Sequence, residues 1–502
     1  MMRLIELMRA TGLVDQGLRG GAADQEITAV SCDSAAVQQG ALFFALPGHH
    51  THGAAYARDA LRAGAAAVVT DAEGSEVLAM SDMATKVPVI VLEHPRESMA
   101  VIAASFYGHP ARDVAMLGVT GTNGKTSVTH LVQTAMETAG TSCGLIGTLG
   151  AHFSPWGTRE HPRTTPESPD LQRLLFEMQR DGAKAVAMEV SSIAVREHRV
   201  DAIEFDVMGF TGLSHDHLDY HKTMESYFEA KAELFTPGRS RLGVVMIDDE
   251  WGERVARGAS IPVVTVASRP HKDAQWWAVR THQGIRIEGP EAAQLSLPIA
   301  HDFAVANALL TIAMAHTQGV PAQLSADALA QARVPGRMET IASLQDRTFV
   351  VDYAHSPDAI ERVITAARAD RTHGRIIIVL GAGGDRDQQK RPAMGRAAAL
   401  ADLVIVTDDN PRTEDPAEIR NMVRRGAELG NAEVQEIASR QEALAFAVQA
   451  SQPGDIVLVV GKGHETTQDL GDRVVAFDDR QVLAFFVRQQ FGSGGGERGE
   501  GE

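Results

Sequence analysis

The segment Gly118 to Thr126, with the sequence Gly-Val-Thr-Gly-Thr-Asn-Gly-Lys-Thr, contains the residue types that hold a nucleoside triphosphate. Glycines let successive backbone N–H groups turn toward phosphate oxygens, Lys125 supplies a mobile cation, and the Thr126 hydroxyl can ligate magnesium. The common form of this motif would place a glycine at Val119, whereas here the glycines stand at 118, 121 and 124. A glycine-rich turn without a ligand is the alternative, and the flanking sequence favours the phosphate loop.

A second group of polar residues follows two other apolar runs. Glu189 closes one run, and the next run leads into a segment with His215, His217 and His221. A carboxylate and imidazoles at neighbouring strand ends suit magnesium or manganese bound together with ATP phosphates. For His215 and His221 the residues alone favour a solvated polar loop.

Lys231 stands in a helical stretch, Tyr227 to Phe235, outside the Phe228 and Phe235 stripe. By itself the spacing favours a surface salt bridge to Glu225, Glu229 or Glu233.

Three further clusters lie in the last third of the chain. They are the segments 381–387, 408–412 and 461–465, which contain two arginines and several carboxylates. Guanidinium groups bind carboxylates through two parallel hydrogen bonds, and acidic groups bind ammonium. An ordinary turn explains any one cluster equally well, but three at one sheet edge favour a site for a small zwitterion.

Each cluster follows an apolar run that predicts a β-strand. Val114 to Leu117 precedes the glycine loop, and apolar residues from Val128 to Met136 recur at helical spacing up to Gly140. In a parallel sheet with helical crossovers, ligands gather beyond the carboxyl ends of the strands, where all these clusters fall. Further strands are predicted at 42–46, 66–70, 87–92, 183–190, 205–210, 243–247, 349–352, 375–380, 403–406 and 455–460.

These elements predict an α/β protein of three domains. The boundaries are expected at 1–108, 109–336 and 337–490, with a disordered tail over 491–502. The central domain is a P-loop-type ATP-binding α/β domain, and the C-terminal domain is a Rossmann-like doubly wound parallel sheet.

Composition narrows the range of partners and compartments. The net charge of −18 and the absence of a Lys/Arg-rich block argue against nucleic acid or an anionic membrane as a partner. No apolar segment approaches the roughly 20 residues of a membrane helix, and the start of the chain lacks a secretory signal. We therefore expect a cytoplasmic protein, in which Cys32 and Cys143 are small buried hydrophobes.

Together these segments resemble the Mur ligase family, the ATP-dependent amino-acid-adding enzymes of peptidoglycan precursor synthesis. The resemblance spans nearly the whole chain. It rests on the glycine loop and on the segments Met188 to Ser192, Leu213 to His221, Gly336 to Glu339 and Asp352 to Pro357. The segment Asp409-Asn410-Pro411-Arg412 looks like the signature of the members that add meso-diaminopimelate. The second carboxylate of diaminopimelate needs a guanidinium partner, whereas a lysine substrate has no such carboxylate and needs none.

The resemblance implies roles for individual residues. Lys125, Lys231 and Arg337 would be catalytic, and Lys231 falls where the family has a lysine carbamylated by carbon dioxide. That modification reverses the interpretation of Lys231 as a surface salt-bridge residue, since a carbamate is a carboxylate-like ligand for magnesium. Mg²⁺ would be bound by Thr126, Glu189, His217 and carbamylated Lys231. ATP would be held by Gly121, Thr122, Asn123, Gly124, Lys125, Thr126, Ser127, Asn307 and Arg337.

Two substrate sites are implied in the same way. The UDP-muramoyl dipeptide would be bound by Cys32, Ser34, His49, His50, Thr51, Thr164, Thr165, Ser191, Glu197 and Arg199. Diaminopimelate would be bound by Arg386, Asp409, Asn410, Pro411, Arg412, Gly461 and Glu465.

Several positions depart from the family pattern. Ile193 replaces a histidine, Glu197 a common glutamine, and His52 an aspartate, while Met246 replaces an asparagine. The Gly-x-Phe-Asn lead to the adenine-side asparagine reads His301-Asp302-Phe303-Ala304. These changes affect fine contacts and leave the phosphate loop, the magnesium ligands and the diamino-acid arginines in place.

The implied activity is the ATP-dependent addition of meso-2,6-diaminopimelate to the D-glutamate γ-carboxylate of UDP-N-acetylmuramoyl-L-alanyl-D-glutamate, through an acyl phosphate. The expected protein is a cytoplasmic monomer with only small-molecule partners. The alternatives are a lysine-adding or folylpolyglutamate-type ligase, or a nucleotide-binding regulator that forms no bond.

Overall fold

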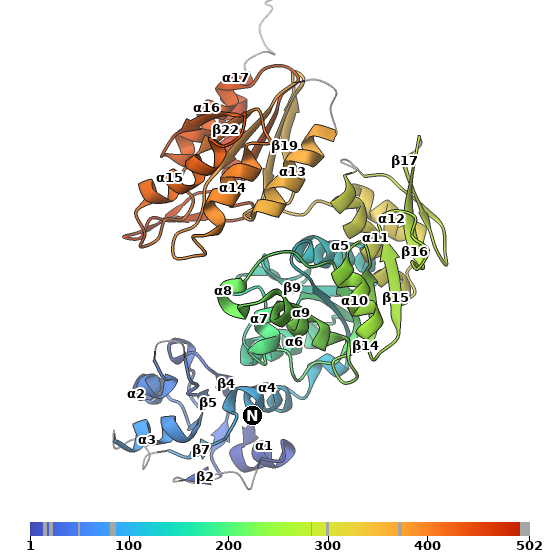
Figure 1. Ribbon diagram of the computed structural model, residues 1–502. Helices are drawn as coiled ribbons and strands as arrows, with labels where there is room; N and C mark the ends of the chain where they lie inside the picture. Colours follow the sequence, from blue (N-terminus) through green and yellow to red (C-terminus); the bar gives the residue numbers. More distant parts are fainter. Residues whose placement is uncertain are drawn as a thin grey trace, which may run out of the picture. The chain divides into compact units, whose positions relative to one another are not determined.

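The computed structural model describes residues 1–13, 18–19, 24–48, 51–80, 87–282, 284–297, 301–369 and 374–491 (Figure 1). The chain divides into two compact units. The first contains Met1–Leu213, Tyr220–Leu295 and Ala308–Leu329, and the second contains Ser214–Asp219, Ser296–Asn307 and the chain from Ala330 onward. His217 and Asn307, expected in the central domain, therefore belong to the second unit. His49, His50 and residues 492–502 of the expected tail lie outside the described residues.

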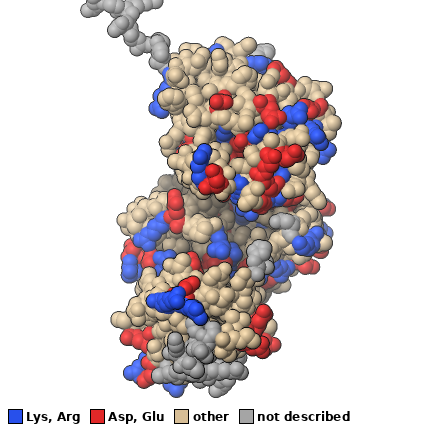
Figure 2. Space-filling view, turned by 90° about the vertical axis from the view of Figure 1, so that its left-hand side faces the viewer, with Lys and Arg blue, Asp and Glu red and all other residues tan. Residues whose placement is uncertain are grey.

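Charges of both signs are intermixed on the face shown in Figure 2, where groups of Lys and Arg lie among groups of Asp and Glu. None of the helices in the described part of the chain is both long and apolar enough to span a membrane.

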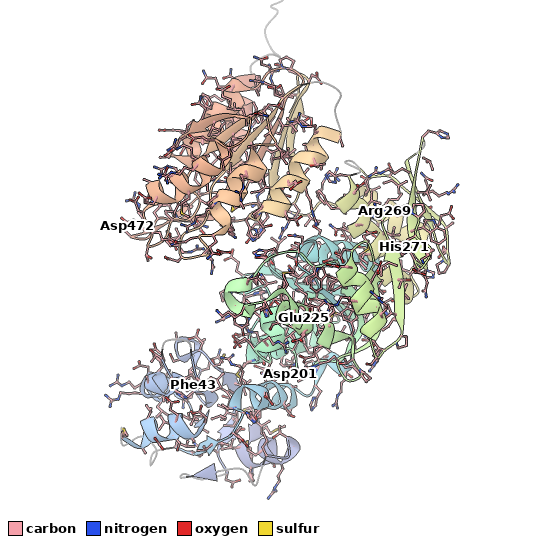
Figure 3. The ribbon with its side chains drawn as sticks, in the orientation of Figure 1. Phe43, Asp201, Glu225, Arg269, His271 and Asp472 are labelled. Atoms are coloured by element: carbon pink, nitrogen blue, oxygen red, sulfur yellow. The ribbon has the colours of Figure 1, made fainter. Side chains whose placement is uncertain are left out.

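The N-terminal region forms a five-stranded sheet in the order β2-β7-β6-β5-β4. Its strands from β4 to β7 are parallel. Phe43 (Figure 3) and Phe44 alternate along β5 and enter separate buried clusters on the two faces of the sheet. The elements are β2 (Leu18–Arg19), β4 (Ala29–Ser31), β5 (Ala41–Phe44), β6 (Ala67–Thr70), β7 (Val89–Val91), α1 (Leu4–Ala10), α2 (Ala57–Arg62), α3 (Ala72–Met80) and α4 (Pro95–Phe106).

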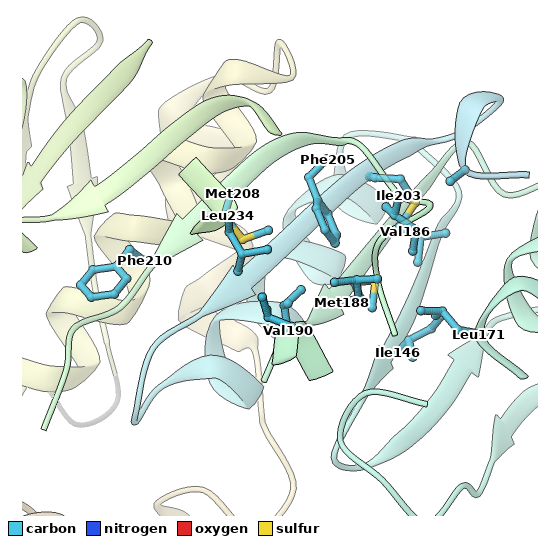
Figure 4. Close-up of a cluster of buried hydrophobic side chains, with 14 of the residues drawn as sticks. Ile146, Leu171, Val186, Met188, Val190, Ile203, Phe205, Met208, Phe210 and Leu234 are labelled. Carbon is cyan, nitrogen blue, oxygen red and sulfur yellow. The ribbon is translucent and has the colours of Figure 1, made fainter. Parts of the chain in front are cut away.

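The central region forms an eleven-stranded sheet in the order β11-β10-β9-β12-β8-β13-β14-β15-β16-β17-β18. Strand β8 lies between β12 and β13 and is parallel to both. Buried side chains of β12 and β13, including Met188 and Phe205, pack into one apolar core (Figure 4). The strands are β8 (Ala115–Thr120), β9 (Cys143–Gly147), β10 (Gly150–Phe153), β11 (Gly157–Arg159), β12 (Ala185–Glu189), β13 (Phe205–Phe210), β14 (Ser240–Met246), β15 (Val263–Ala267), β16 (Trp276–Thr281), β17 (Gly284–Glu288) and β18 (Ala293–Leu295).

Helices follow several of these strands in the chain. They are α5 (Lys125–Thr138), α6 (Ser168–Arg180), α7 (Ser192–Arg196), α8 (Leu218–His221), α9 (Met224–Ala232), α10 (Glu250–Gly258), α11 (Asp302–Thr317) and α12 (Ala322–Gln331).

The C-terminal region forms a six-stranded sheet in the order β19-β20-β24-β21-β22-β23. Only the edge strand β19 is antiparallel. Buried clusters cover both faces, one including residues of α13, α14 and α15 and the other residues of α16 and α17, which confirms the doubly wound sheet. The elements are β19 (Glu339–Leu344), β20 (Arg347–Asp352), β21 (Ile376–Leu380), β22 (Leu403–Val406), β23 (Glu433–Glu436), β24 (Ile456–Val460), α13 (Pro357–Ala369), α14 (Lys390–Ala398), α15 (Pro416–Ala427), α16 (Arg440–Ala450) and α17 (Asp479–Phe491).

All the predicted strands are present, with ends that differ by a few residues. Strand β8 continues to Thr120, three residues beyond the predicted end. Phe491, assigned to the tail, is the last residue of α17.

Candidate active site

The glycine loop joins β8 directly to α5, as predicted. Gly121 has φ +143° and Gly124, the residue before α5, has φ +86°. A methyl group on Gly121 would come 1.9 Å from Thr211 Oγ1. Glycine is therefore required at 121 by both conformation and space, and the loop ends at the positive N-terminus of a fourteen-residue helix.

Polar side chains hold the loop from both sides. Lys125 Nζ donates to the carbonyl oxygens of Gly121 and Thr122, at 3.0 and 2.9 Å. Thr211 Oγ1 donates to Asn123 O at 2.5 Å, and the Thr122 hydroxyl lies 3.1 Å from the Tyr227 hydroxyl. The ammonium group of Lys125 thus lies against the loop that would hold the phosphates.

Glu189 lies beside the first turn of α5, because β12 pairs with β8 in parallel register. Glu189 is 1% exposed, and its Oε2 accepts a hydrogen bond from Thr126 Oγ1 at 3.0 Å. The backbone N–H of Thr148 donates to Oε1 at 2.7 Å. A hydroxyl and a carboxylate in contact are hard oxygen ligands of the kind that Mg²⁺ prefers, so these two predicted ligands fit the ion.

Lys231 is buried, with 1% exposure, and its Nζ donates to Gly121 O at 2.8 Å. The surface position that the helical spacing favours is therefore wrong for Lys231. Two of the three glutamates considered as its partners pair with arginines, Glu225 with Arg254 and Glu233 with Arg239. The end of the Lys231 side chain therefore lies at the phosphate loop.

The histidines separate into different environments. His221 is buried, and its Nε2 lies 2.8 Å from Ser192 Oγ, so the solvated-loop interpretation is wrong for this residue. His215 is exposed. His217 belongs to the second unit, as do Asn307 and Arg337. Their proximity to the phosphate loop stays a prediction.

Four of the residues predicted for the UDP-muramoyl dipeptide lie together around the end of β12, namely Thr164, Thr165, Ser191 and Arg199. Thr165 Oγ1 donates to Glu189 O at 2.9 Å and accepts from Ser191 N at 3.1 Å. Arg199 donates to Thr165 O at 3.3 Å, and Thr164 Oγ1 lies 3.1 Å from Thr148 Oγ1. Burial lowers the pKa of the Arg199 guanidinium from its usual value. These hydroxyl groups and the Arg199 guanidinium therefore lie beside Glu189, a predicted magnesium ligand.

The structure explains how Glu197 is accommodated. Its carboxylate lies 3.2 Å from an Arg96 nitrogen on α4 and accepts a hydrogen bond from the Tyr220 hydroxyl at 2.8 Å. Arg96 also lies 3.3 Å from Glu167. The negative charge of Glu197 is thus compensated by an arginine from the N-terminal region. Ile193, the other departure in this segment, lies in the short helix α7.

In the N-terminal region, the departure at His52 also has a local reason. His52 Nδ1 accepts a hydrogen bond from Ala54 N at 3.0 Å, and so caps the following turn as an aspartate would. Cys32 is only partly buried, so the prediction of a buried cysteine is wrong for this residue, whereas Cys143 is buried. Desolvation, followed by the charge of Glu167, raises the pKa of the Cys32 thiol to about 12. Ser34 begins a short 3₁₀ turn, and Thr51 is exposed.

Three loops converge at the carboxyl ends of β21, β22 and β24 in the second unit. Arg412 donates to Gly384 O at 2.6 Å, and Asn410 Nδ2 donates to Glu465 Oε2 at 2.9 Å. A methyl group on Gly461 would come 2.7 Å from Asp409 Oδ2. The predicted diamino-acid residues are therefore brought together, with Arg386 on the loop that Arg412 contacts.

A hairpin beside these loops completes this part of the site. It consists of β25 (Thr467–Asp469) and β26 (Val474–Ala476), and its turn carries Asp472 (Figure 3). Gln468 Nε2 donates to Asp409 O at 2.7 Å, and Asp469 N donates to Asn410 Oδ1 at 3.0 Å.

Five contributing residues were missed from the sequence: Thr148, Arg96, Lys462, Arg391 and Glu414. Arg391 is buried and makes two 2.8 Å contacts with Glu414, whose pKa it lowers to about 2. Glu414 also accepts a hydrogen bond from Asp385 N, so the pair joins the loops of Arg386 and Arg412. Only Lys462 had a signal, since it stands inside a predicted cluster.

Comparisons with known proteins agree with this arrangement. The Mur ligase middle domain model matches residues 119–315, the Mur ligase glutamate ligase domain model matches 336–463, and the Mur ligase family catalytic domain model matches 26–107. A UDP-N-acetylmuramoyl-L-alanyl-D-glutamate–2,6-diaminopimelate ligase of Streptomyces coelicolor is 45% identical over 494 residues, which cover 96% of each chain. One of Streptomyces avermitilis is 44% identical over 500 residues, which cover 96% of this chain and 97% of the relative.

A solved structure of a UDP-N-acetylmuramoyl-L-alanyl-D-glutamate–2,6-diaminopimelate ligase has a TM-score of 0.64 to this chain at 28% identity, and covers 97% of this chain and 99% of the other. The chain that contains the phosphate loop, the buried Glu189 and Lys231 and the three converging C-terminal loops thus matches these enzymes almost from end to end. It belongs to the Mur ligase family.

Proposed function

We propose that this Mur ligase adds meso-2,6-diaminopimelate to the D-glutamate side-chain carboxylate of UDP-N-acetylmuramoyl-L-alanyl-D-glutamate, with conversion of ATP to ADP and phosphate. The observation that carries the proposal is the convergence of Arg386, the Asp409–Arg412 segment and Glu465 in one site. The guanidinium groups of Arg386 and Arg412, together with the carboxylates of Asp409 and Glu465, suit an amino acid with two carboxylates and two ammonium groups. The diaminopimelate ligases that match nearly the whole chain support the same assignment.

The reaction needs activation because a carboxylate is a poor electrophile. Transfer of the γ-phosphoryl group of ATP to the D-glutamate carboxylate gives an acyl phosphate and ADP. The diaminopimelate amine then attacks the acyl carbon, loses a proton, and displaces phosphate through a tetrahedral intermediate. Negative charge develops in both steps, so preorganised cations stabilise the transition states.

The residues of the first unit have distinct tasks. Lys125 and the N-terminus of α5 hold the phosphates. Thr126 and Glu189 would hold Mg²⁺, with His217 and carbamylated Lys231, and the ion supplies charge neutralisation at the phosphates. Carbamylation replaces the buried Lys231 ammonium with a carboxylate-like group. Arg337 and Asn307 of the second unit would contact the nucleotide.

The dipeptide carboxylates would be bound near Thr164, Thr165, Ser191 and Arg199, with the uridine nucleotide at Cys32, Ser34, His49, His50 and Thr51. The substrates are small and water-soluble, so the proposed setting is the cytoplasm. We propose a monomer, since one chain supplies residues for every substrate.

A direct assay tests the proposal. The full chain is incubated with ATP, Mg²⁺, the UDP-muramoyl dipeptide and either meso-diaminopimelate or lysine, and phosphate release and product mass are measured. We expect stoichiometric phosphate and a product one diaminopimelate residue heavier, in the diaminopimelate reaction only. Phosphate with lysine alone would contradict the specificity, and phosphate release independent of any amino acid would indicate a nucleotide-binding regulator.

A further inference from the structure

Lys462 is a buried cation among the residues proposed to bind the diamino acid. Its side chain has 0% exposure, and its Nζ lies 3.1 Å from Asn410 Oδ1 and 2.9 Å from Glu465 Oε2. A buried ammonium group needs partners that replace its lost hydration. Both partners here are residues of the proposed diamino-acid site.

The three side chains form a closed set of hydrogen bonds. Asn410 Nδ2 donates to the same Glu465 Oε2 at 2.9 Å. Since an ammonium group can only donate, Lys462 fixes Asn410 with Oδ1 toward itself and Nδ2 toward Glu465. The backbone N–H of Asp469 donates to Oδ1 at 3.0 Å and supports the same orientation.

This arrangement makes the two carboxylate oxygens of Glu465 unequal. Oε2 takes the hydrogen bonds from Lys462 and Asn410, whereas Oε1 makes none with the residues that the structure describes. The Glu465 side chain is 31% exposed. Oε1 is therefore available to a ligand ammonium group, with which it forms a charge-assisted hydrogen bond.

The backbone on both sides of Lys462 is fixed. Gly461 and Gly463 have φ values of +110° and +53°. A methyl group on Gly461 would come 2.7 Å from Asp409 Oδ2, and one on Gly463 would come 2.7 Å from Tyr353 Cβ. The direction of Lys462 into the interior is thus set by the strand end itself.

We propose that Lys462 is a positioning residue for the diamino acid, which orients Asn410 and Glu465 so that Glu465 Oε1 receives a ligand ammonium group. The inference rests on the proposed function, because it takes the diamino acid as the ligand.

The test compares Lys462→Met with the wild type in the full chain, with separate KM values for diaminopimelate, ATP and the UDP-muramoyl dipeptide. We expect at least a tenfold rise in the diaminopimelate KM, with the other two KM values within twofold. Arg375→Met is the matched control, because Arg375 pairs with Asp455 at the amino ends of β21 and β24. It should leave all three KM values unchanged, and thermal melting verifies that both variants are folded.

Three results would overturn the inference: a folded Lys462→Met with an unchanged diaminopimelate KM, an equal rise in all three KM values, or a similar selective rise in Arg375→Met. If Lys462→Met does not fold, Lys462→Gln replaces it, since the amide keeps hydrogen-bonding capacity but carries no charge, and its oxygen can also accept, so it does not fix the orientation of Asn410. The same selective rise is expected, and an unchanged KM would again refute the role.

The double variant Lys462→Met/Glu465→Gln tests whether Lys462 acts through Glu465. We expect the combined effect on KM to be smaller than the product of the single effects, whereas a multiplicative effect would exclude this route. Wild-type protein that does not use diaminopimelate at all would instead refute the proposed function, so the two failures are distinguishable.

Discussion

At the scale of single residues, burial separates functional side chains from ordinary ones of the same type. Lys231 and Lys462 are both buried, and both bond oxygen atoms of predicted site residues. Lys184, in contrast, is exposed at the start of β12. Lysine seldom gives up its hydration without a compensating partner, so these two buried lysines indicate function more strongly than their sequence context does.

We expect Lys231→Ala to lower turnover by at least a hundredfold, because the variant cannot form the proposed carbamate or supply its proposed contribution to magnesium binding. Bicarbonate should not restore activity, whereas short-chain carboxylic acids should restore part of it by filling the vacated space. The measurement is phosphate release with all three substrates saturating, with Lys184→Ala as the control that keeps full activity. Full turnover in Lys231→Ala would show that no carbamate is needed.

At the scale of elements, strand ends and glycines bring the loops together. Gly384 packs so tightly on the next loop that a methyl group would come 1.8 Å from Pro411 O. The backbone N–H of Gly384 also donates to Asn410 O at 2.9 Å. The spacing between the Arg386 and Arg412 loops therefore depends on the absence of a side chain.

We expect Gly384→Ala to separate these loops, with a tenfold or greater rise in the diaminopimelate KM and a loss of about 1–3 kcal/mol in the free energy of unfolding. ATP binding, measured by calorimetric titration, should be unchanged, because neither the phosphate loop nor Asn307 and Arg337 belong to the two loops that Gly384 joins. Gly258→Ala is the matched control, since no atom lies within 4 Å of the added methyl group. An unaltered diaminopimelate KM in Gly384→Ala would contradict the role of this close contact.

At the scale of the whole molecule, the chain has two compact units, and a buried histidine lies in the second of them. In the second unit, burial, with the nearby charge of Lys390, lowers the pKa of His355 from 6.5 to about 4. The folded unit therefore favours the neutral form of His355 at pH values above about 4.

We expect the second unit to lose stability as the pH falls. The folded-state pKa lies below that of the unfolded chain, so the unfolded state binds the proton first, and the contribution is complete above about pH 6.5 and lost toward pH 4. The loss due to His355 is roughly 1–3 kcal/mol. Denaturant unfolding of wild type and His355→Gln at several pH values measures it. Burial raises the pKa of Asp352, which acts in the opposite direction, so the difference between the two proteins isolates His355. Equal pH slopes would disprove the assignment.

Much of this architecture follows from local sequence. Strands such as β20, β21, β22 and β24 are short apolar runs buried on both faces, and such runs are recognisable without tertiary information. The strand, glycine loop and helix from Ala115 to Thr138 are equally local. Strand ends could be predicted only to within a few residues, because the last hydrogen bonds of a strand depend on its neighbours.

The sequence by itself determined the α/β class, the phosphate loop and the clusters at strand ends, because these depend on residue type, spacing and backbone preference over a few neighbouring positions. Only the tertiary structure decided that Lys231 and His221 are buried, that Arg96 compensates Glu197, and that Lys462 joins Asn410 to Glu465. These contacts join residues between 3 and 110 positions apart in the sequence. They also depend on burial, because a charged group that loses its water needs a hydrogen-bond partner that only the folded chain supplies.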